Sequence, residues 1–288
     1  MASVLITGTS AGLGFATALT VARAGHTVYA TMRNPARSPE LAQTAAKQGL
    51  PIHISTMDVD SDSSVKAGME AIYRDAKHLD VLVNNAGVER SGTVEELPLA
   101  EIRAVMETNY FGALRCIQAV APDMRRRKSG CIINISSVSG KVAASPLGCY
   151  AASKYALEAI SEALAQEMKT FNVRVAIVEP GIIDTAMARR IETPMGPATY
   201  PQQKRFAHLF EASLRNPGQP SMVAEKVLEI IDSDTWQLRH TVGPDAEPLL
   251  EWRKSMTDED WVALHGASDD VWYDRMERDF GMEIRPRK

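Results

Sequence analysis

Two side chains that could together perform acid–base chemistry are Tyr150 and Lys154, which lie four residues apart in the sequence Tyr-Ala-Ala-Ser-Lys. On a helix, residues i and i+4 lie one turn apart on the same face. A lysine ammonium placed there favours the ionised form of the phenol, whose pKa is ordinarily about 10. Proton transfer at neutral pH requires this pKa to fall by about two to three units. We expect the lysine and a second nearby cation to lower it.

A glycine-rich turn near the start of the chain could hold a phosphate group. It follows the short apolar run Val4–Thr7 and precedes a helical pattern. Glycines at such a junction allow a tight turn and a close approach of the backbone to a pyrophosphate, and the helix N-terminus supplies free N–H groups. We therefore expect a dinucleotide to bind at Gly8, Ser10, Ala11, Gly12, Leu13 and Gly14.

The elements that must position these residues alternate along the chain. Short apolar runs predict buried strands, and helical periodicity fills the intervals between them. Repeated strand–helix–strand units indicate an α/β fold, a Rossmann-type three-layer sandwich with a central, mostly seven-stranded parallel sheet. The predicted strands are Val4–Thr7, Thr27–Thr31, Ile52–Met57, Val81–Asn84, Cys131–Ser136, Val173–Glu179 and Leu238–Val242. The predicted helices span residues 12–24, 39–48, 62–77, 99–127, 151–170 and 222–232.

The end of the second predicted strand indicates which dinucleotide binds. An acid at this position bonds the ribose hydroxyls of NAD, and it would repel the 2′-phosphate of NADP. Here the strand runs into Met32-Arg33-Asn34 and carries no acid. A guanidinium binds a phosphate well, so Arg33, helped by Ser10 and Asn34, predicts NADP(H) in preference to NAD(H). The competing interpretation is that Arg33 is a solvated loop residue.

Two segments interrupt the alternation of strands and helices. Residues 185–219 follow the sixth predicted strand, at the edge where open α/β sheets bind ligands, and we expect a substrate lid there. A surface helical insertion is the alternative. Residues 246–288 form a helical tail after a single domain that spans residues 1–245. The tail residues Trp252, Trp261 and Trp272 predict anchors on the core or on a neighbouring subunit, in preference to ligand contacts.

The composition excludes several kinds of partner. The 288 residues are 45% hydrophobic, and 32 basic against 36 acidic residues give a net charge of −4. We expect no nucleic-acid partner, and we interpret the basic run Arg125–Lys128 as a helix end. No apolar run reaches the ~20 residues that span a bilayer, and the early first strand predicts no cleavable signal. Cys116, Cys131 and Cys149 lack metal-ligand spacing, which predicts reduced thiols, a cytoplasmic location and no metal site.

Together these motifs resemble the short-chain dehydrogenase/reductase family, in its single-domain branch, over roughly residues 3–245. The glycine turn is similar to the family's cofactor turn, and Asn84-Asn85-Ala86-Gly87 resembles the motif after its fourth strand. Asn109, Ser137, Tyr150 and Lys154 match its catalytic tetrad in order and spacing, and Pro180-Gly181-Ile182-Ile183-Asp184-Thr185 resembles its nicotinamide-binding segment. The stretch Val28–Asn34 is most similar to NADPH-dependent carbonyl reductases and 17β-hydroxysteroid or retinol dehydrogenase-like members.

The resemblance implies how the cofactor is held. Asp58 would bond the adenine N6 amine beside Val59, and Asn85, Ala86 and Gly87 would line the adenosine ribose side. Lys154 would bind the nicotinamide ribose. Within the segment that starts at Pro180 and Gly181, the Ile183 backbone and the Thr185 hydroxyl would hold the carboxamide. The resemblance also implies pairing through the helices at 99–127 and 151–170, and hence a homodimer or homotetramer.

The resemblance also assigns the chemistry. Tyr150 would be the general acid in carbonyl reduction and the base in the reverse direction, with the nicotinamide ring as the second cation. Ser137 would bond the substrate oxygen, and Asn109 would hold a water that links Lys154 to solvent. Ser136 competes with Ser137, but adjacent strand residues face opposite ways and Ser137 has the family spacing.

The sequence therefore predicts an NADP(H)-dependent oxidoreductase that interconverts a ketone or aldehyde and an alcohol. Its pocket would be walled by residues 89–92, 138–147 and 185–215, with an apolar lid that favours a hydrophobic substrate. The expected lid residues are Met187, Met195, Phe206, Leu209 and Phe210. Arg189, Arg190 and His208 could instead meet an acidic group. The alternatives are an NAD-dependent alcohol dehydrogenase of the same family and a non-catalytic NADPH-binding sensor on the same fold.

Overall fold

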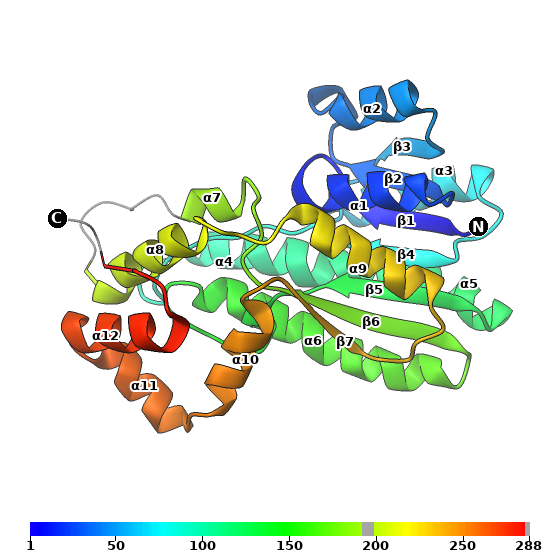
Figure 1. Cartoon of the computed structure of the whole chain (residues 1–288). Coiled ribbons are helices and arrows are strands. Elements are labelled where there is room, and N and C mark those ends of the chain that lie inside the picture. Colours follow the sequence, from blue (N-terminus) through cyan, green and yellow to red (C-terminus); the bar gives the residue numbers. More distant parts are fainter. Residues whose placement is uncertain (192–198, 286–288) are drawn as a thin grey trace.

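The computed structural model of the chain describes residues 1–191 and 199–285. Seven parallel strands form one sheet in the order β3-β2-β1-β4-β5-β6-β7 (Figure 1). Their bounds are Ser3–Thr7 (β1), Thr27–Met32 (β2), Ile52–Thr56 (β3), Val81–Asn84 (β4), Gly130–Ile135 (β5), Val173–Pro180 (β6) and Arg239–Val242 (β7). The predicted fold class is confirmed, because short apolar runs that alternate with helices are stable as a covered parallel sheet.

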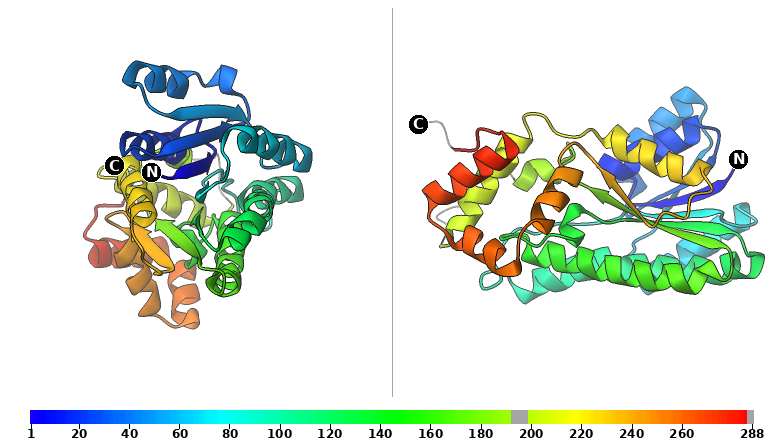
Figure 2. Two further views of the ribbon diagram at one scale, coloured as in Figure 1. Left: turned by 90° about the vertical axis from the view of Figure 1, so that its right-hand side faces the viewer. Right: turned by 60° about the horizontal axis from the view of Figure 1, so that its bottom comes forward.

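Helices cover both faces of the sheet, and Figure 2 shows the resulting layers. Val4 and Ile6 belong to the core under α1, α2 and α9, whereas Leu5 belongs to the core under α3, α5 and α6. This division follows from the strand period of two, which points successive side chains to opposite faces. The bounds are Gly12–Arg23 (α1), Glu40–Gln48 (α2), Asp62–Asp75 (α3), Ala113–Arg127 (α5), Gly148–Lys169 (α6) and Pro220–Asp232 (α9).

Two helix predictions need correction. The helix expected over residues 99–127 is divided into α4 (Leu99–Met106), a π-helical segment η2 (Glu107–Gly112) and α5. Wide π turns are typical of functional sites, and periodicity alone does not reveal them. The helix expected from residue 151 begins at Gly148, so Tyr150 lies in the first turn of α6.

The helices that follow β6 and β7 lie beyond the carboxyl ends of the sheet, except α9, which covers one of its faces (Figure 1). The order of strands reverses between β1 and β4, which is the position where open α/β sheets bind their ligands. Short helices also follow β2 and β5, at Pro35–Arg37 (η1) and Val138–Gly140 (η3). The remaining helices are Ala188–Ile191 (α7), Pro201–Ser213 (α8), Ala246–Lys254 (α10), Asp258–Gly266 (α11) and Asp269–Phe280 (α12).

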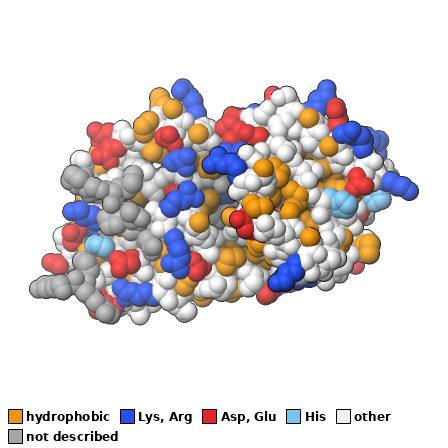
Figure 3. All heavy atoms as spheres, turned by 90° about the horizontal axis from the view of Figure 1, so that it is seen from above, with side chains coloured by type: hydrophobic (Ala, Val, Ile, Leu, Met, Phe, Trp, Pro, Cys, Tyr) orange, Lys and Arg blue, Asp and Glu red, His pale blue; other side chains and the backbone are white. Residues whose placement is uncertain are grey.

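Surface charge is mixed on the face seen in Figure 3, where basic and acidic side chains are interspersed. Within the described ranges, no helix has the length and apolar character that crossing a membrane requires. The three cysteines are buried and free.

Candidate active site

The glycine turn between β1 and α1 has the backbone shape that a pyrophosphate requires. Gly8 and Gly12 have φ values of +70° and +58°, in the left-handed region that favours glycine. A Cβ atom on Gly14 would collide with the Gly8 carbonyl and with the Asn85 amide. The α1 N-terminus has no side-chain cap, so its first N–H groups remain available to an anion. These residues therefore fit the pyrophosphate of a dinucleotide.

Asn85 and Ala86 brace this turn from the end of β4. The Asn85 Nδ2 donates to the carbonyls of Thr7 (2.8 Å) and Gly8 (3.0 Å). The Thr7 hydroxyl accepts from the backbone N–H groups of Asn85 and Ala86, each at 3.0 Å. The motif after the fourth strand thus fixes the phosphate turn, in addition to any contact that it makes with a ribose.

The end of β2 presents a cation and no acid. Arg33 and Asn34 are exposed directly after the strand. In the described part of the chain, Arg33 has no hydrogen bond or ion pair. Burial raises the pKa of the neighbouring Asp60 carboxyl, and the Arg33 guanidinium opposes this rise. Asp58 is held nearby, because its N–H donates to Ser64 Oγ at 2.9 Å.

The structure brings the four predicted catalytic residues to one place. Tyr150 and Lys154 lie one turn apart on α6, with the lysine Nζ 5.7 Å from the centre of the phenol ring. Lys154 is buried and donates to the Ile135 carbonyl at 2.8 Å. Ser137 follows β5 and lies beside Tyr150 on the cavity wall, where its hydroxyl lowers the pKa of the phenol. The Ser136 hydroxyl is buried with no partner among the described residues, so Ser137 is the serine that faces the tyrosine.

Asn109 lies in η2, and both ends of its side-chain amide are hydrogen-bonded to the protein. Its Oδ1 accepts from the Val88 N–H at 2.8 Å, and its Nδ2 donates to the Val88 carbonyl and to Ser153 Oγ, each at 2.9 Å. The side chain is therefore a brace between the β4 loop and α6.

The electrostatics of Tyr150 differ from the sequence-based expectation. Burial raises its phenol pKa to about 12; the hydrogen bond with Ser137 lowers it, and the Glu89 carboxylate raises it further. Burial also lowers the pKa of Lys154 to about 8, against the opposing field of Glu158. The expected lowering of the phenol pKa is thus wrong for the protein alone. Burial is the largest influence on both pKa values, because a low-dielectric site disfavours the phenolate and the ammonium alike.

The segment after β6 is fixed by a residue that sequence reasoning missed. Asp245 follows β7, and its Oδ2 accepts from the Ile182 N–H at 2.8 Å. A Cβ atom on Gly181 would collide with the same carboxylate. Thr185 lies opposite the glycine turn, with its Cγ2 3.6 Å from the position of a Cβ on Gly12. The phosphate turn and the predicted nicotinamide segment therefore border one space.

A cavity of about 200 Å³ adjoins Tyr150, Ser137 and the segment after β6. Its walls include the loop after β4, the segments after β5 and β6, helices α7 and α8, and the tail. Aliphatic and aromatic side chains predominate. Val142, Leu147, Met187, Phe206, Leu209 and Phe210 are among the wall residues. Of the expected lid residues, Met195 lies outside the described residues.

The chain resembles known proteins over most of its length. The profile described as short chain dehydrogenase matches residues 2–196. The chain belongs to the short-chain dehydrogenase family. It is 34% identical to the 3-ketodihydrosphingosine reductase of Bacteroides thetaiotaomicron, over 88% of this chain and 91% of that protein. It is 36% identical to retinol dehydrogenase 8 of Bos taurus, over 86% of this chain and 83% of the relative. A short-chain dehydrogenase from Streptomyces avermitilis has a similar structure, with a TM-score of 0.77, 31% identity, and coverage of 88% of this chain and 92% of that one.

Family membership makes the chain an oxidoreductase of the short-chain dehydrogenase type, which uses a nicotinamide cofactor.

The tail of this short-chain dehydrogenase lines the cavity. The sequence-based prediction that its tryptophans are anchors in preference to ligand contacts therefore needs correction. Trp252, Trp261 and Trp272 are all wall residues. Trp261 Nε1 also donates to the Ala143 carbonyl at 3.1 Å, and Trp272 is 3% exposed in a cluster with Ala212 of α8. The tryptophans therefore dock the tail on the core and also form part of the cavity wall.

Arg189, Arg190 and His208, which the sequence offered as partners for an acidic substrate group, are bonded elsewhere. In the described ranges, none of them lines the cavity. Arg189 pairs with Asp184 at 2.7 Å, Arg190 Nε donates to the Ala186 carbonyl at 3.0 Å, and His208 Nδ1 bonds the Tyr273 hydroxyl at 2.6 Å. These residues lie near the cavity walls in the sequence, but their side chains point to other partners and not into the cavity.

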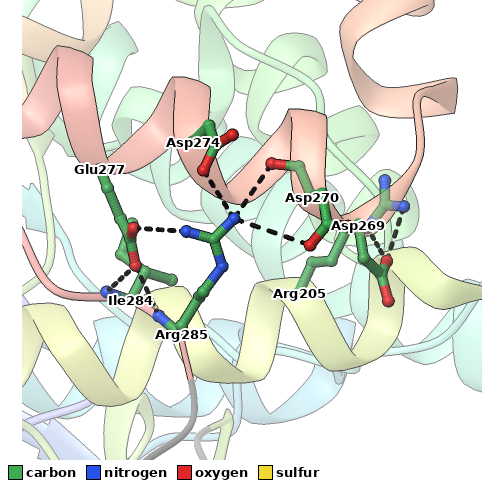
Figure 4. Close-up of polar contacts among 7 residues, drawn as sticks. All are labelled: Arg205, Asp269, Asp270, Asp274, Glu277, Ile284 and Arg285. Carbon is green, nitrogen blue, oxygen red and sulfur yellow. Dashed lines mark hydrogen bonds and ion pairs between the residues drawn. The ribbon is translucent and has the colours of Figure 1, made fainter.

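Arg205 is the cation that does reach the cavity wall, and it joins the tail to α8 (Figure 4). It bonds Asp269 at 2.7 Å, the His265 carbonyl at 3.2 Å and the Ala267 carbonyl at 2.7 Å. Arg285 ties the chain after α12 back to that helix through Asp274 and Glu277. Hydrogen bonds from all three Arg205 nitrogens thus go to the tail.

Sequence reasoning also missed a cluster of charged residues that joins α6, β6 and β7. Glu158 lies one turn after Lys154 on α6 and is 4% exposed. Arg239 of β7 bonds its Oε2 at 2.9 Å, Glu179 of β6 at 3.3 Å and Glu162 at 2.7 Å. Burial, followed by the Glu158 charge, raises the pKa of Glu179 to about 7. The cluster therefore links the catalytic helix to the strand that leads into the nicotinamide segment.

Proposed function

We propose that this chain is an NADP(H)-dependent oxidoreductase that interconverts a ketone or aldehyde and an alcohol. The observation that carries the proposal is the hydroxyl pair of Ser137 and Tyr150, which lies beside Lys154 and borders an apolar cavity. This cavity is at the carboxyl edge of the sheet, where the fold places ligands.

Each residue of the group has a role in the reduction. When bound, the nicotinamide cofactor supplies the hydride. Tyr150 gives its proton to the substrate oxygen, and Ser137 donates a hydrogen bond as negative charge develops there. The raised pKa of Tyr150 keeps the phenol protonated until that moment. Lys154, with a pKa of about 8, is still largely an ammonium at pH 7 and stabilises the phenolate that remains.

The choice of NADP(H) over NAD(H) is supported by Arg33. Its side chain is exposed at the end of β2, where a 2′-phosphate would lie, and the strand ends without an acid. An NAD site would instead have a carboxylate there to bond the ribose hydroxyls.

A hydrophobic substrate is supported by the cavity walls and by the names of the relatives. Wall residues from three separate segments are mostly aliphatic or aromatic, so burial of a hydrocarbon body supplies the binding free energy. Retinol and 3-ketodihydrosphingosine, for which two relatives are named, both have long hydrocarbon parts.

The test is absorbance-monitored oxidation of NADPH and of NADH in the presence of steroid, aryl and alicyclic ketones and aldehydes. We expect turnover with NADPH that is lost in Tyr150→Phe. We expect Arg33→Asp to weaken NADPH binding much more than NADH binding, by about tenfold or more, because a carboxylate would replace a charge-assisted hydrogen bond to the phosphate.

Two results would contradict the proposal. Tight NADPH binding without Tyr150-dependent turnover on any carbonyl would favour the non-catalytic sensor. Faster turnover with NADH, unaffected by Arg33→Asp, would favour an NAD-dependent alcohol dehydrogenase.

A further inference from the structure

Four Asp, Glu, Arg or His residues of the described chain line the cavity, and they differ in what holds them. Arg205 is bonded to Asp269 and to two carbonyls. Asp245 accepts from the Ile182 N–H through Oδ2, while its Oδ1 is buried with no partner among the described residues; its charge is not among those that shift the pKa of Tyr150. His265 uses Nδ1 to bond the Trp261 carbonyl at 2.9 Å, and burial lowers its pKa, so the ring is neutral. The fourth is Glu89, in the loop after β4.

Glu89 is a carboxylate in an apolar cavity without an ion-pair partner in the described part of the chain. Its one side-chain hydrogen bond there comes from the Ser91 hydroxyl at 2.6 Å. The adjacent Arg90 is taken by Glu101 at 2.6 Å and by the Glu89 carbonyl at 2.8 Å. Burial raises the pKa of the Glu89 carboxyl, and the Ser91 hydrogen bond and the charges of Arg90 and Arg190 oppose this rise without cancelling it. An unpaired carboxylate in such surroundings is costly unless a ligand compensates it.

This carboxylate also opposes the proposed chemistry. Its field reaches Tyr150 and the adjacent Cys149, and it raises the pKa of both groups. When Tyr150 releases its proton in the reduction, the resulting phenolate faces the Glu89 charge. A substrate that neutralised Glu89 would remove this repulsion in the transition state, where the gain accelerates the reaction.

We propose that the substrate carries a positively charged nitrogen close to its reacting carbonyl, and that Glu89 binds this nitrogen. The proposal rests on the carbonyl-reductase function proposed above and specifies its substrate class as amino ketones with a hydrophobic body. A neutral hydroxyl could satisfy one carboxylate oxygen, but it would leave the charge uncompensated. An ammonium N–H both donates a charge-assisted hydrogen bond and neutralises the charge.

The test compares two ketones of nearly the same shape. The first is 2-(dimethylamino)acetophenone, which is cationic when protonated, and the second is isovalerophenone, in which a CH group replaces the nitrogen. The kcat/KM ratio of the pair is measured with NADPH, below the pKa of the amine, in the natural protein and in Glu89→Gln. Because an ammonium changes the intrinsic reactivity of the carbonyl, the decisive quantity is the change of the ratio between the two proteins.

We expect Glu89→Gln to lower the preference for the amino ketone by about tenfold or more, since a charge-assisted hydrogen bond is lost. Turnover of isovalerophenone should persist, which shows that the variant is folded. The control is Glu96→Gln, which removes a charge that lies in the same loop but does not line the cavity. It should leave the ratio unchanged.

The outcomes separate this inference from the proposed function. A ratio that changes less than about twofold in Glu89→Gln, with both ketones reduced, overturns the role of Glu89 and leaves the reductase function standing. An equal loss of preference in Glu96→Gln also overturns it, because the effect would then be one of general charge. If neither ketone nor any other carbonyl oxidises NADPH, the proposed function itself fails.

Discussion

Substitution of Glu158 by Gln should shift the pH dependence of catalysis, although Glu158 touches neither substrate nor cofactor. Glu158 is buried one helical turn from Lys154, and its charge supports the lysine ammonium against burial. Two charges about 6 Å apart, at an effective dielectric constant of about 20, interact by roughly 2.8 kcal/mol, which corresponds to about two pH units. Arg239 bonds the same carboxylate and offsets part of this field. A shift of about one unit is therefore expected.

The sign of the shift follows from the pKa of Lys154, which burial has already lowered to about 8. Removal of the Glu158 charge lowers it further, so the alkaline limb of the kcat profile should move to lower pH. The assay is kcat for NADPH-dependent ketone reduction measured from pH 6 to pH 10.

The matched control is Glu162→Gln. Glu162 bonds the same arginine but is about half exposed, one turn further from the lysine. Its substitution should move the limb much less. An unchanged alkaline limb in Glu158→Gln, or an equal movement in Glu162→Gln, would refute the reasoning.

Two further predictions concern stability. Glu179 has a folded pKa of about 7 against an ordinary value of 4.5, so the folded chain holds a proton that the unfolded chain releases between these values. Its burial therefore costs stability, and this cost grows as pH rises from about 4.5 to 7. Glu179→Gln should raise the free energy of unfolding at pH 8 by up to about 3 kcal/mol, and hence raise Tm, but it should not do so at pH 4. A pH-independent change in thermal unfolding would contradict this. Arg205→Met should leave the His265 and Ala267 carbonyls unpaired, a cost of roughly 1–3 kcal/mol. Amide exchange in α11 and α12 should then be about tenfold faster while exchange in the sheet is unchanged; equal acceleration in both would show global destabilisation instead.

Some sites were predictable because local sequence alone dictates them. Glycine at positions 8, 12 and 14 is required by backbone conformation and by contacts a few ångströms away. The four-residue spacing of Tyr150 and Lys154 fixes their relation on any helix. Asp245 and Glu158 gave no such signal, because each acts on a partner that another strand brings to it.

The sequence by itself determined the parallel sheet, the phosphate turn and the identity of the paired tyrosine and lysine. Each of these follows from periodicity, from backbone constraints or from spacing within one element. Only the tertiary structure decided that the tail tryptophans line the cavity, that Arg205 bonds the tail, and that burial raises the pKa of Tyr150 to about 12. Those properties depend on which distant segments meet and on how much water they exclude, and a linear pattern of residues does not specify either.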